Sequence, residues 1–493
     1  MIGRILLRTA AEQGDAPALI HDGQSISHSQ LAVAALRWAT LLEKSVDARE
    51  MNPVAVRLPN TPDSVLIVAA LMVLGIPVLP LNPQWCPEEI ARSLGGLALS
   101  GIVTADGDLP VWRACPAFVS TPLVGLEDLR ERAAFATPLA VTNRSDDDSG
   151  DRPALVLMTS GTTGTPKPVV RSQNNLLANA RQVGEALGWA AGHRVLSVTP
   201  FHHANGFSNG LLLPLLRGGC IVSLARFFPA TLARLLRDER VDTLIASPVV
   251  YRAMLACDEG TAVLGLLKEC LSSGAPLPDD VALRAARQAS VYIRELYGSS
   301  ETGTVSIEPP RQPDEPRSAG LPVPGVEVAI LTENGRRLPH GLEGLVAVRS
   351  PAVMRGYWTP DGIDPARSDD GWYLIGDRGL IDGKGELHLC GRFRAFVNVG
   401  GNKVDPREIE AIIREIDGVV RCRVDGRPDD RGTEEVCAEV FLRSGSGLDR
   451  TALLAHMRRQ LAEYKLPRRI ELHEYIPPAL PDKHTDVSAE SDR

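Results

Sequence analysis

Strand-like runs of apolar residues alternate with segments of helical periodicity through most of the chain. Residues 241–247 (VDTLIAS) predict a buried strand, and the VVYRAMLA that follows predicts a helix. Residues 279–289 likewise predict a helix ahead of a strand at 289–298. This alternation is typical of α/β units built on largely parallel sheets.

The pattern changes in the last third of the chain. Between about residues 320 and 350 the apolar runs become short and are separated by turn residues, which predicts a β-rich subdomain. From about Gly391 onward, further helices and strands predict a small α+β domain. We therefore expect an α/β fold with a large N-terminal domain of α/β subdomains, a β-rich subdomain and a small C-terminal domain.

One apolar segment is long enough to suggest a membrane span. The 18 residues Ser64–Leu81 carry no charge. Gly75 and Pro77 divide the segment, however, into a helical piece and a β-like piece. We expect a buried helix followed by a buried strand, and no membrane span.

Composition narrows the class of protein. A net charge of −8 argues against nucleic-acid binding, which normally shows a basic surface. With 44% hydrophobic and 23% charged residues the chain reads as a large soluble enzyme. Its eight cysteines include no CxxC pair, which predicts free thiols in a reducing compartment and a cytoplasmic location.

The strongest chemical signal is the segment LVLMTSGTTGTPKPVV at 155–170. Small residues let backbone N–H groups approach phosphate oxygens closely, while hydroxyl groups and a lysine add donors and charge. The spacing is not that of a Walker loop, and taken alone the segment could be a plain turn. The phosphate-binding candidates are Thr159, Ser160, Gly161, Thr162, Thr163, Gly164 and Lys167.

Further motifs follow in a fixed order along the chain. They are LPNTPDSV and LNPQWCPEEI upstream of the loop, then PFHHANGF (200–207), SSGAPLP (272–278), YGSSETG (297–303), GWYLIGDRG (371–379), GRFRAFVNVGGNKVDPREIE (391–410) and a terminal Lys483. In this order and over essentially its whole length, the chain resembles the adenylate-forming superfamily. That superfamily comprises acyl-CoA synthetases, luciferases and the adenylation domains of peptide synthetases.

The resemblance implies an ATP site. Tyr297 would contact adenine, Asp377 would accept hydrogen bonds from the ribose, and Ser300 would bind the α-phosphate. Glu301 would hold Mg²⁺, a cation that prefers carboxylate oxygen. The remaining ATP-binding positions that the resemblance implies are Gly274, Ala275, Pro276, Gly298, Ser299 and Arg392.

The resemblance also implies a carboxylic acid as substrate. His203 takes the position beside the carboxylate, and His202 stands where phenylalanine is usual. Amino-acid-activating relatives carry an aspartate at the His203 position, so an α-amino acid is disfavoured. An aryl acid and an aliphatic acid both remain open. The acyl-lining candidates are His203, Asn205, Gly206, Ser247, Val249 and Ser273.

Two domains that move against each other are implied. Residues 1–393 would bind ATP and the acid, and residues 394–493 would form a mobile lid that turns about Arg394. Lys483 would neutralise charge as the acyl-adenylate forms, and Gly401 would leave a channel for a thiol. Asn398 replaces the family's lysine. We expect Lys403 to be a surface charge rather than a substitute for that lysine.

The resulting hypothesis is an ATP-dependent, AMP-forming ligase. ATP and Mg²⁺ would activate the acid as acyl-AMP with release of pyrophosphate, and coenzyme A would take the acyl group. Lys483, His203, Glu301 and Ser300 are the expected catalytic residues. Two alternatives remain: the phosphopantetheine arm of a separate carrier protein as acceptor, and a non-catalytic nucleotide-binding relative, which Asn398 and Asp482 suggest.

Overall fold

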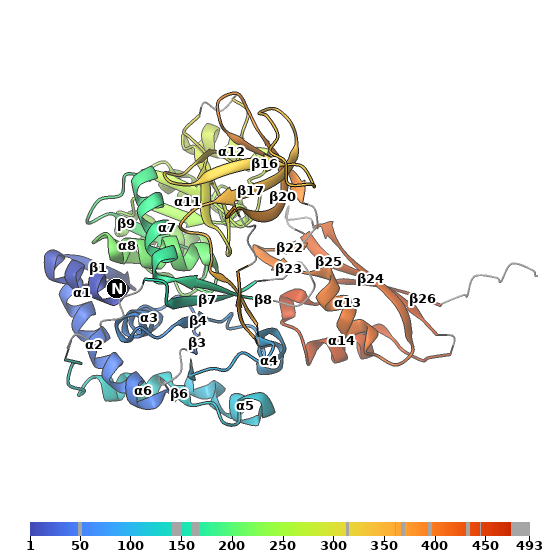
Figure 1. The fold of residues 1–493 in the computed structure, drawn as a ribbon, viewed down its shortest axis with the longest axis horizontal. Helices are drawn as coiled ribbons and strands as arrows, with labels where there is room; N and C mark the ends of the chain where they lie inside the picture. The colour runs from blue at the N-terminus through green and yellow to red at the C-terminus, as the bar shows by residue number, and fades with distance from the viewer. Residues whose placement is uncertain are drawn as a thin grey trace, which may run out of the picture.

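Two large sheets, one small sheet and a separate C-terminal unit make up the structure, a computed structural model (Figure 1). The structure describes residues 1–47, 52–140, 150–159, 167–311, 315–359, 361–365, 370–392, 397–429, 434–443 and 445–474. Of Arg392 only the backbone is described.

The first large sheet has eight strands, of which five neighbours run parallel and three at one edge are antiparallel. In spatial order the strands are β19 (Gly362–Asp364), β18 (Gly356–Thr359), β8 (Lys167–Ser172), β7 (Pro153–Thr159), β4 (Val78–Pro80), β3 (Val54–Arg57), β5 (Gly101–Thr104) and β6 (Leu123–Gly125).

The second large sheet has nine strands, with a parallel centre from β13 to β1 and antiparallel strands at both edges. In spatial order they are β15 (Leu321–Pro322), β14 (Gly303–Ile307), β13 (Ile293–Ser299), β12 (Glu269–Ser272), β11 (Thr243–Ala246), β9 (Arg194–Ser197), β10 (Cys220–Val222), β1 (Pro17–His21) and β2 (Gln24–Ser27). These two sheets confirm the expected α/β class.

Helices fill the space between and around the sheets. One hydrophobic core contains side chains of both sheets and of α1, α2, α3 and α7. The helices of the large part are α1 (Ile2–Gln13), α2 (His28–Ser45), α3 (Pro62–Leu74), α4 (Pro87–Leu94), η1 (Asp106–Asp108), α5 (Leu109–Ala114), η2 (Pro116–Phe118), α6 (Leu126–Ala133), α7 (Gln173–Ala186), η3 (Gly206–Leu212, π-helical), α8 (Leu213–Leu216), α9 (Pro229–Asp238), α10 (Pro248–Met254), α11 (Asp258–Leu264), α12 (Asp279–Arg284) and η4 (Ala285–Ala289, π-helical).

The long apolar segment folds as its breakers predict. It contributes α3, whose N-terminus is closed by a capping box of Thr61 and Ser64, and then β4. Gly75 ends the helix in a left-handed conformation, with φ 71°. Val65 to Met72 are buried on every side because the helix lies inside the shared core. In the described part of the chain, no helix has the length and apolarity to cross a bilayer.

A four-stranded antiparallel sheet forms the expected β-rich subdomain. Its strands are β16 (Glu327–Leu331), β17 (Gly344–Arg349), β20 (Tyr373–Ile381) and β21 (Leu387–Arg392).

The C-terminal unit has a hydrophobic core of its own, formed by residues between Val397 and Leu466. In Figure 1 it lies, orange to red, at one side of the molecule and beside α4. Its elements are β22 (Val397–Val399), β23 (Asn402–Val404), α13 (Pro406–Arg414), β24 (Val419–Pro428), β25 (Glu434–Leu442), α14 (Arg450–Arg458), η5 (Glu463–Lys465) and β26 (Arg469–Glu474).

All eight cysteines are free thiols, and five of them are buried. All eight lie in the described residues, and none of them pairs in a disulfide bond there.

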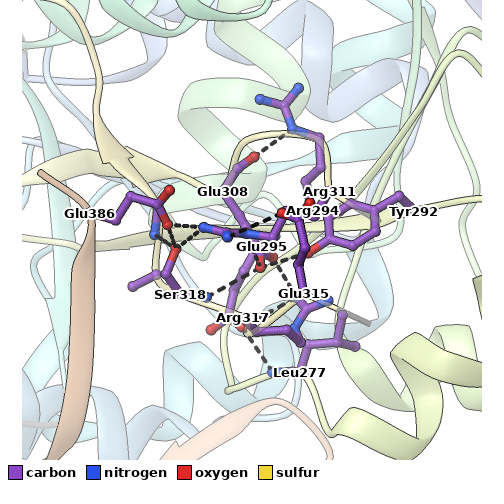
Figure 2. Close-up of polar contacts among 12 residues, drawn as sticks. Leu277, Tyr292, Arg294, Glu295, Glu308, Arg311, Glu315, Arg317, Ser318 and Glu386 are labelled. Atoms are coloured by element: carbon purple, nitrogen blue, oxygen red, sulfur yellow. Dashed lines mark hydrogen bonds and ion pairs between the residues drawn. The ribbon is translucent and has the colours of Figure 1, made fainter. Parts of the chain in front are cut away.

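A buried ion network supports the strand that leads into the YGSSETG motif (Figure 2). The fully buried Glu308 accepts hydrogen bonds from Arg317 at 2.6 Å and from the hydroxyl of Tyr292 at 2.7 Å. Glu295, on β13, accepts a hydrogen bond from the backbone N–H of Leu277 at 3.3 Å. The network therefore joins β13 to the loop that follows β12.

Glu295 gives a pH-dependent stability prediction. Burial raises the pKa of Glu295 from its ordinary 4.5 to about 7, so the folded state disfavours its ionised form. Its stabilising contribution is complete below pH 4.5 and is lost as the pH rises to about 7. That loss amounts to about 3 kcal/mol. Relative to the wild type, Glu295→Gln should gain stability by roughly 2 kcal/mol between pH 5 and pH 8. Chemical denaturation at both pH values measures the difference; a pH-independent difference would contradict it.

Candidate active site

A single cavity of about 840 Å³ opens where the two large sheets, the four-stranded sheet and the C-terminal unit meet. Thr159, Ser247, Ser273 and Ser299 line it, and each ends or directly follows a strand of the two large sheets. The carboxyl ends of strands in α/β sheets are the usual place for ligands. Residues 400–403 of the C-terminal unit complete the wall.

A lysine and a carboxylate lie on either side of Tyr357 at one end of the cavity. Lys167 begins β8 directly after the phosphate-loop motif, and its Nζ lies 5.1 Å from the centre of the Tyr357 ring. The hydroxyl of Tyr357 donates to Oε1 of Glu301 at 3.2 Å. It also lies 2.8 Å from the hydroxyl of Tyr373. A phosphate chain and its counter-ion would meet opposite charges here.

The YGSSETG motif folds into a tight turn after β13. The hydroxyl of Ser299 accepts from the backbone N–H of Thr302 at 3.2 Å, and Gly298, Ser299, Ser300 and Glu301 all line the cavity. Tyr297 is buried just behind them.

Tyr297, predicted to contact adenine, lies beside Asp377, which was predicted to bind the ribose. Its hydroxyl donates to Oδ2 of Asp377 at 2.6 Å, although neither residue lies on the cavity wall. The two predicted nucleoside contacts are thus direct neighbours, although 80 residues separate them in the sequence.

Several predicted positions lie outside the described residues. They are Ser160, Gly161, Thr162, Thr163, Gly164, Arg394, Asp482 and Lys483, together with the side chain of Arg392.

The histidine pair lies on the cavity wall. The rings of His202 and His203 are 4.5 Å apart between centroids. Burial, with a smaller contribution from Lys403, lowers the pKa of His203 to about 4. Burial also holds the pKa of His202 well below its ordinary value. Both rings keep some surface towards the cavity, and both are neutral at physiological pH.

A chain of amides forms the adjoining wall. Asn179 donates to Oδ1 of Asn209 at 3.0 Å, and Asn209 donates to Oδ1 of Asn205 at 2.7 Å. Asn205 in turn donates to the hydroxyl of Ser273. All four residues line the cavity, so this part of its wall is polar.

Two further predicted acyl positions also face the cavity, whereas Gly206, Ala275 and Pro276, like Tyr297 and Asp377, do not. Ser247 and Val249 line the wall as expected. Gly206 is not on the wall: a Cβ there would lie 2.2 Å from the carbonyl oxygen of Pro200, so this glycine serves close backbone packing. Gly274 lines the cavity, but Ala275 and Pro276 do not.

The C-terminal unit presents the turn between β22 and β23 to the cavity. Gly401 lies against Ser247, at 3.7 Å from its Cβ to the position a Cβ of Gly401 would occupy. Asn398 donates from its side chain to the carbonyl oxygen of Gly274 at 3.3 Å and accepts from the N–H of Gly401 at 2.9 Å.

The expectation that Lys403 is a surface charge is wrong. Lys403 lines the cavity close enough to His203 to lower the pKa of that histidine. The reason is the docked position of the C-terminal unit, which carries this strand into the site.

A buried ion cluster fixes that position. Nζ of Lys465 lies 2.5 Å from Glu89 on α4 and 2.9 Å from Glu408 on α13. Burial alone would lower the pKa of Lys465, but Glu408 and Glu89 outweigh it and raise the pKa. Tyr464 adds a hydrogen bond of 2.9 Å from the indole of Trp85. The lysine therefore stays charged and ties the two units together.

Of the residues that the sequence did not single out, Ser208 and Asn209 carry a recognisable signal, whereas Lys465 and Glu89 do not. Ser208 and Asn209 are neighbouring polar residues inside the otherwise apolar run that forms η3 and α8, and Asn205 lies four residues before Asn209. Lining side chains at this spacing share one helix face. Lys465 and Glu89 are 376 residues apart, and nothing local pairs them.

Comparison with known families decides the assignment. A family described as "AMP-binding enzyme" matches residues 6–358, and "AMP-binding enzyme C-terminal domain" matches residues 408–479. The chain belongs to the AMP-binding enzymes. This result confirms the resemblance to the adenylate-forming superfamily that the motifs indicate.

Individual AMP-binding enzymes match over nearly their whole length. A feruloyl-CoA synthase of Amycolatopsis is 28% identical over 97% of this chain and 96% of its own. A sulfoacetate–CoA ligase of Cupriavidus necator is 28% identical over 95% of this chain and 93% of its own length. A malonyl-CoA ligase solved as a ternary product complex with methylmalonyl-CoA and AMP superposes with a TM-score of 0.79. It is 28% identical, over 94% of this chain and 97% of that one.

Gly303, at the start of β14, gives a stability prediction for the cavity wall. Its φ is +70°, and a Cβ there would lie 2.5 Å from Oδ1 of the buried Asn179. Gly303→Ala should therefore lower the free energy of unfolding by about 1–3 kcal/mol. The matched control is Gly383→Ala, where a Cβ meets open space and the change should stay within about 0.5 kcal/mol. Equal melting temperatures for both variants would contradict this account.

Proposed function

We propose that this AMP-binding enzyme is an acid–coenzyme A ligase. The acid carboxylate attacks the α-phosphorus of ATP and pyrophosphate leaves; the thiol of coenzyme A then attacks the acyl carbon and AMP leaves. One observation carries the proposal: a single cavity joins Lys167 and Glu301, the histidine at 203 and the turn at Gly401. A nucleotide, an acid and a thiol can therefore meet in one enclosed space.

The nucleotide occupies the end of the cavity around Tyr357. Lys167, Thr159 and Ser300 contact the phosphates, with the loop of residues 160–164 supplying backbone donors. Tyr297 and Asp377 serve the adenosine. The hydrogen bond between them supports this pairing, because it holds the ribose acceptor beside the aromatic ring.

Glu301 is the proposed Mg²⁺ ligand. Its carboxylate lines the cavity and receives a hydrogen bond from Tyr357 at one oxygen. Mg²⁺ is commonly held by one or two carboxylates together with substrate phosphates, so this single carboxylate fits the ion. When bound, the ion neutralises phosphate charge.

His203 and the amide wall position the acid. The neutral imidazole of His203 orients the reacting carboxylate without pairing with it, so the carboxylate keeps its nucleophilic charge. Asn205, Ser247, Val249 and Ser273 surround the rest of the molecule. We place Lys483, which lies outside the described residues, beside the developing charge during adenylation.

The described orientation suits the second step. Gly401 borders the cavity beside Ser247 and leaves room for a thiol arm, and Asn398 fixes the turn against Gly274. The thiol loses its proton to solvent as the carbon–sulfur bond forms. We place the boundary of the two domains at residues 393 and 394, just before the first residue of the separate C-terminal core.

The free thiols favour a cytoplasmic location for this ligase.

The test of function uses purified protein, ATP and a panel of carboxylic acids. Acid-dependent exchange of pyrophosphate into ATP and accumulation of acyl-CoA without any carrier protein are the expected results. Lys483→Ala should reduce exchange by at least about 100-fold while nucleotide binding persists. Lys384→Ala, at an exposed lysine, is the control. No exchange with any acid would identify a non-catalytic relative, and exchange without acyl-CoA would favour a carrier protein.

The ion cluster at the junction gives a second prediction. Lys465→Met leaves Glu89 and Glu408 without their shared cation. Removing one partner of a buried ion pair destabilises the docked state by about 3–5 kcal/mol. Acyl-CoA formation from preformed acyl-AMP should fall by about 10-fold or more, while pyrophosphate exchange is largely kept, because only the docked orientation loses its cation. The control is Lys384→Met. Equal loss of both half-reactions would contradict a role confined to the second step.

A further inference from the structure

A fully buried arginine lies directly behind the acid end of the cavity. Arg171, on β8, donates to the carbonyl oxygens of Ala352 at 3.0 Å and of Asn175 at 3.3 Å. It makes a long contact of 3.5 Å with the hydroxyl of Ser208. Within the described part of the chain it has no carboxylate partner, and its Nε has no hydrogen-bond partner.

Two carbonyl groups and one hydroxyl meet this cation, but among the described residues no negative charge does. Burial lowers the pKa of Arg171 to about 10, so the guanidinium is still protonated at neutral pH. A buried charge is costly unless an opposite charge or several hydrogen bonds meet it. The fold pays this cost beside a cavity, which is where a ligand could supply the missing charge.

Very little material separates the guanidinium from the cavity. Gly303 lines the cavity, and a Cβ on it would lie 2.8 Å from Nη2 of Arg171. Ser208 also lines the cavity; since its oxygen accepts from Arg171, its own O–H is left to donate elsewhere. An anion in the cavity would therefore meet a hydroxyl donor backed by a positive charge.

The remaining polar groups of the wall agree with an anionic ligand. The carboxylates on the described wall are Glu301 and Glu408, and the latter already pairs with Lys465.

We propose that the acid carries a second anionic oxygen group, a carboxylate or a sulfonate, beside the carboxylate that reacts. This group lies against Ser208 and Gly303, where Arg171 supplies the opposite charge. Arg171 acts as a specificity residue through the field it imposes and touches no reacting atom. The inference rests on the proposed function, because it concerns the acid that this ligase activates.

The first experiment compares acids that differ only in the second charge. Malonate, succinate, glutarate and adipate are each measured against their monomethyl esters by pyrophosphate exchange, and 3-sulfopropanoate against butanoate. For the best chain length, the dianionic acid should have a KM at least about 10-fold lower than its ester. The comparison of 3-sulfopropanoate with succinate shows whether the subsite prefers a sulfonate to a carboxylate. Esters and butanoate that are used as well as the dianions would overturn the inference.

The second experiment removes the charge. Arg171→Met should raise KM for the dianionic acid by about 10-fold while KM for the monoester and the affinity for ATP stay unchanged. Arg171→Lys should recover part of the preference for the dianionic acid over its ester. A purely structural role of Arg171 would not predict this recovery. Ser208→Ala tests the same subsite if Arg171→Met fails to fold. An equal loss for the acid and its ester would overturn the inference.

Calorimetric titration with glutarate and monomethyl glutarate separates the two proposals. Glutarate that binds in an Arg171-dependent way but supports no exchange would leave the inference standing and refute the ligase. Esters that support exchange while no dianion binds or reacts would refute the inference and leave the ligase standing. Absence of both binding and exchange for every acid would refute both.

Discussion

One ammonium group, Nζ of Lys465, joins the C-terminal unit to the large part beside the cavity. It lies between Glu89 of the large part and Glu408 of the C-terminal unit, and all three side chains are nearly or fully withdrawn from water. Each charge is costly to bury without the others, so the docked position of the two units depends on all three being present. The turn at Gly401 and the strand with Lys403 form part of the cavity wall because of that position.

The inside of the cavity follows a different electrostatic principle. In the large part, its acid end is formed by neutral groups, namely two imidazoles of low pKa and a chain of amides, and Arg171 lies behind them without a carboxylate partner among the described residues. Lys403 of the C-terminal unit adds a positive charge beside His203. Amides that hydrogen-bond to one another keep their geometry when the cavity is filled or empty. The large part supplies these neutral groups, and the C-terminal unit adds Gly401 and Lys403 to the same wall.

Local signals predicted much of this architecture. The breakers Gly75 and Pro77 act within a few residues of the chain, so the helix α3 and the strand β4 could be placed from the pattern alone. Lys167 was predicted from the chemistry of the phosphate loop, and Ser300 and Glu301 from the resemblance of their motif to the family's; all three line the cavity. The roles proposed for individual site residues remain predictions.

The sequence could not predict what depends on distant partners. Gly206 and Asn205 are adjacent, yet only one of them faces the cavity, because helical rotation decides which side a residue takes. Arg171 stands in a strand pattern where a charge would ordinarily face solvent; its burial depends on Ala352, which is 181 residues away. The prediction for Lys403 failed for the same reason. Its environment is formed by residues of the large part, such as His203, and not by its neighbours in the sequence.

Lys403 also has a consequence for how charge reaches the site. His203 stays neutral at physiological pH, so proton uptake there does not change the potential of the acid end. Lys403 belongs to the unit that Lys465 docks, and any rotation of that unit would carry its positive charge away from the acid. The electrostatic potential at the bound acyl group then changes when the C-terminal unit rotates. A change of pH in the physiological range would not produce the same effect.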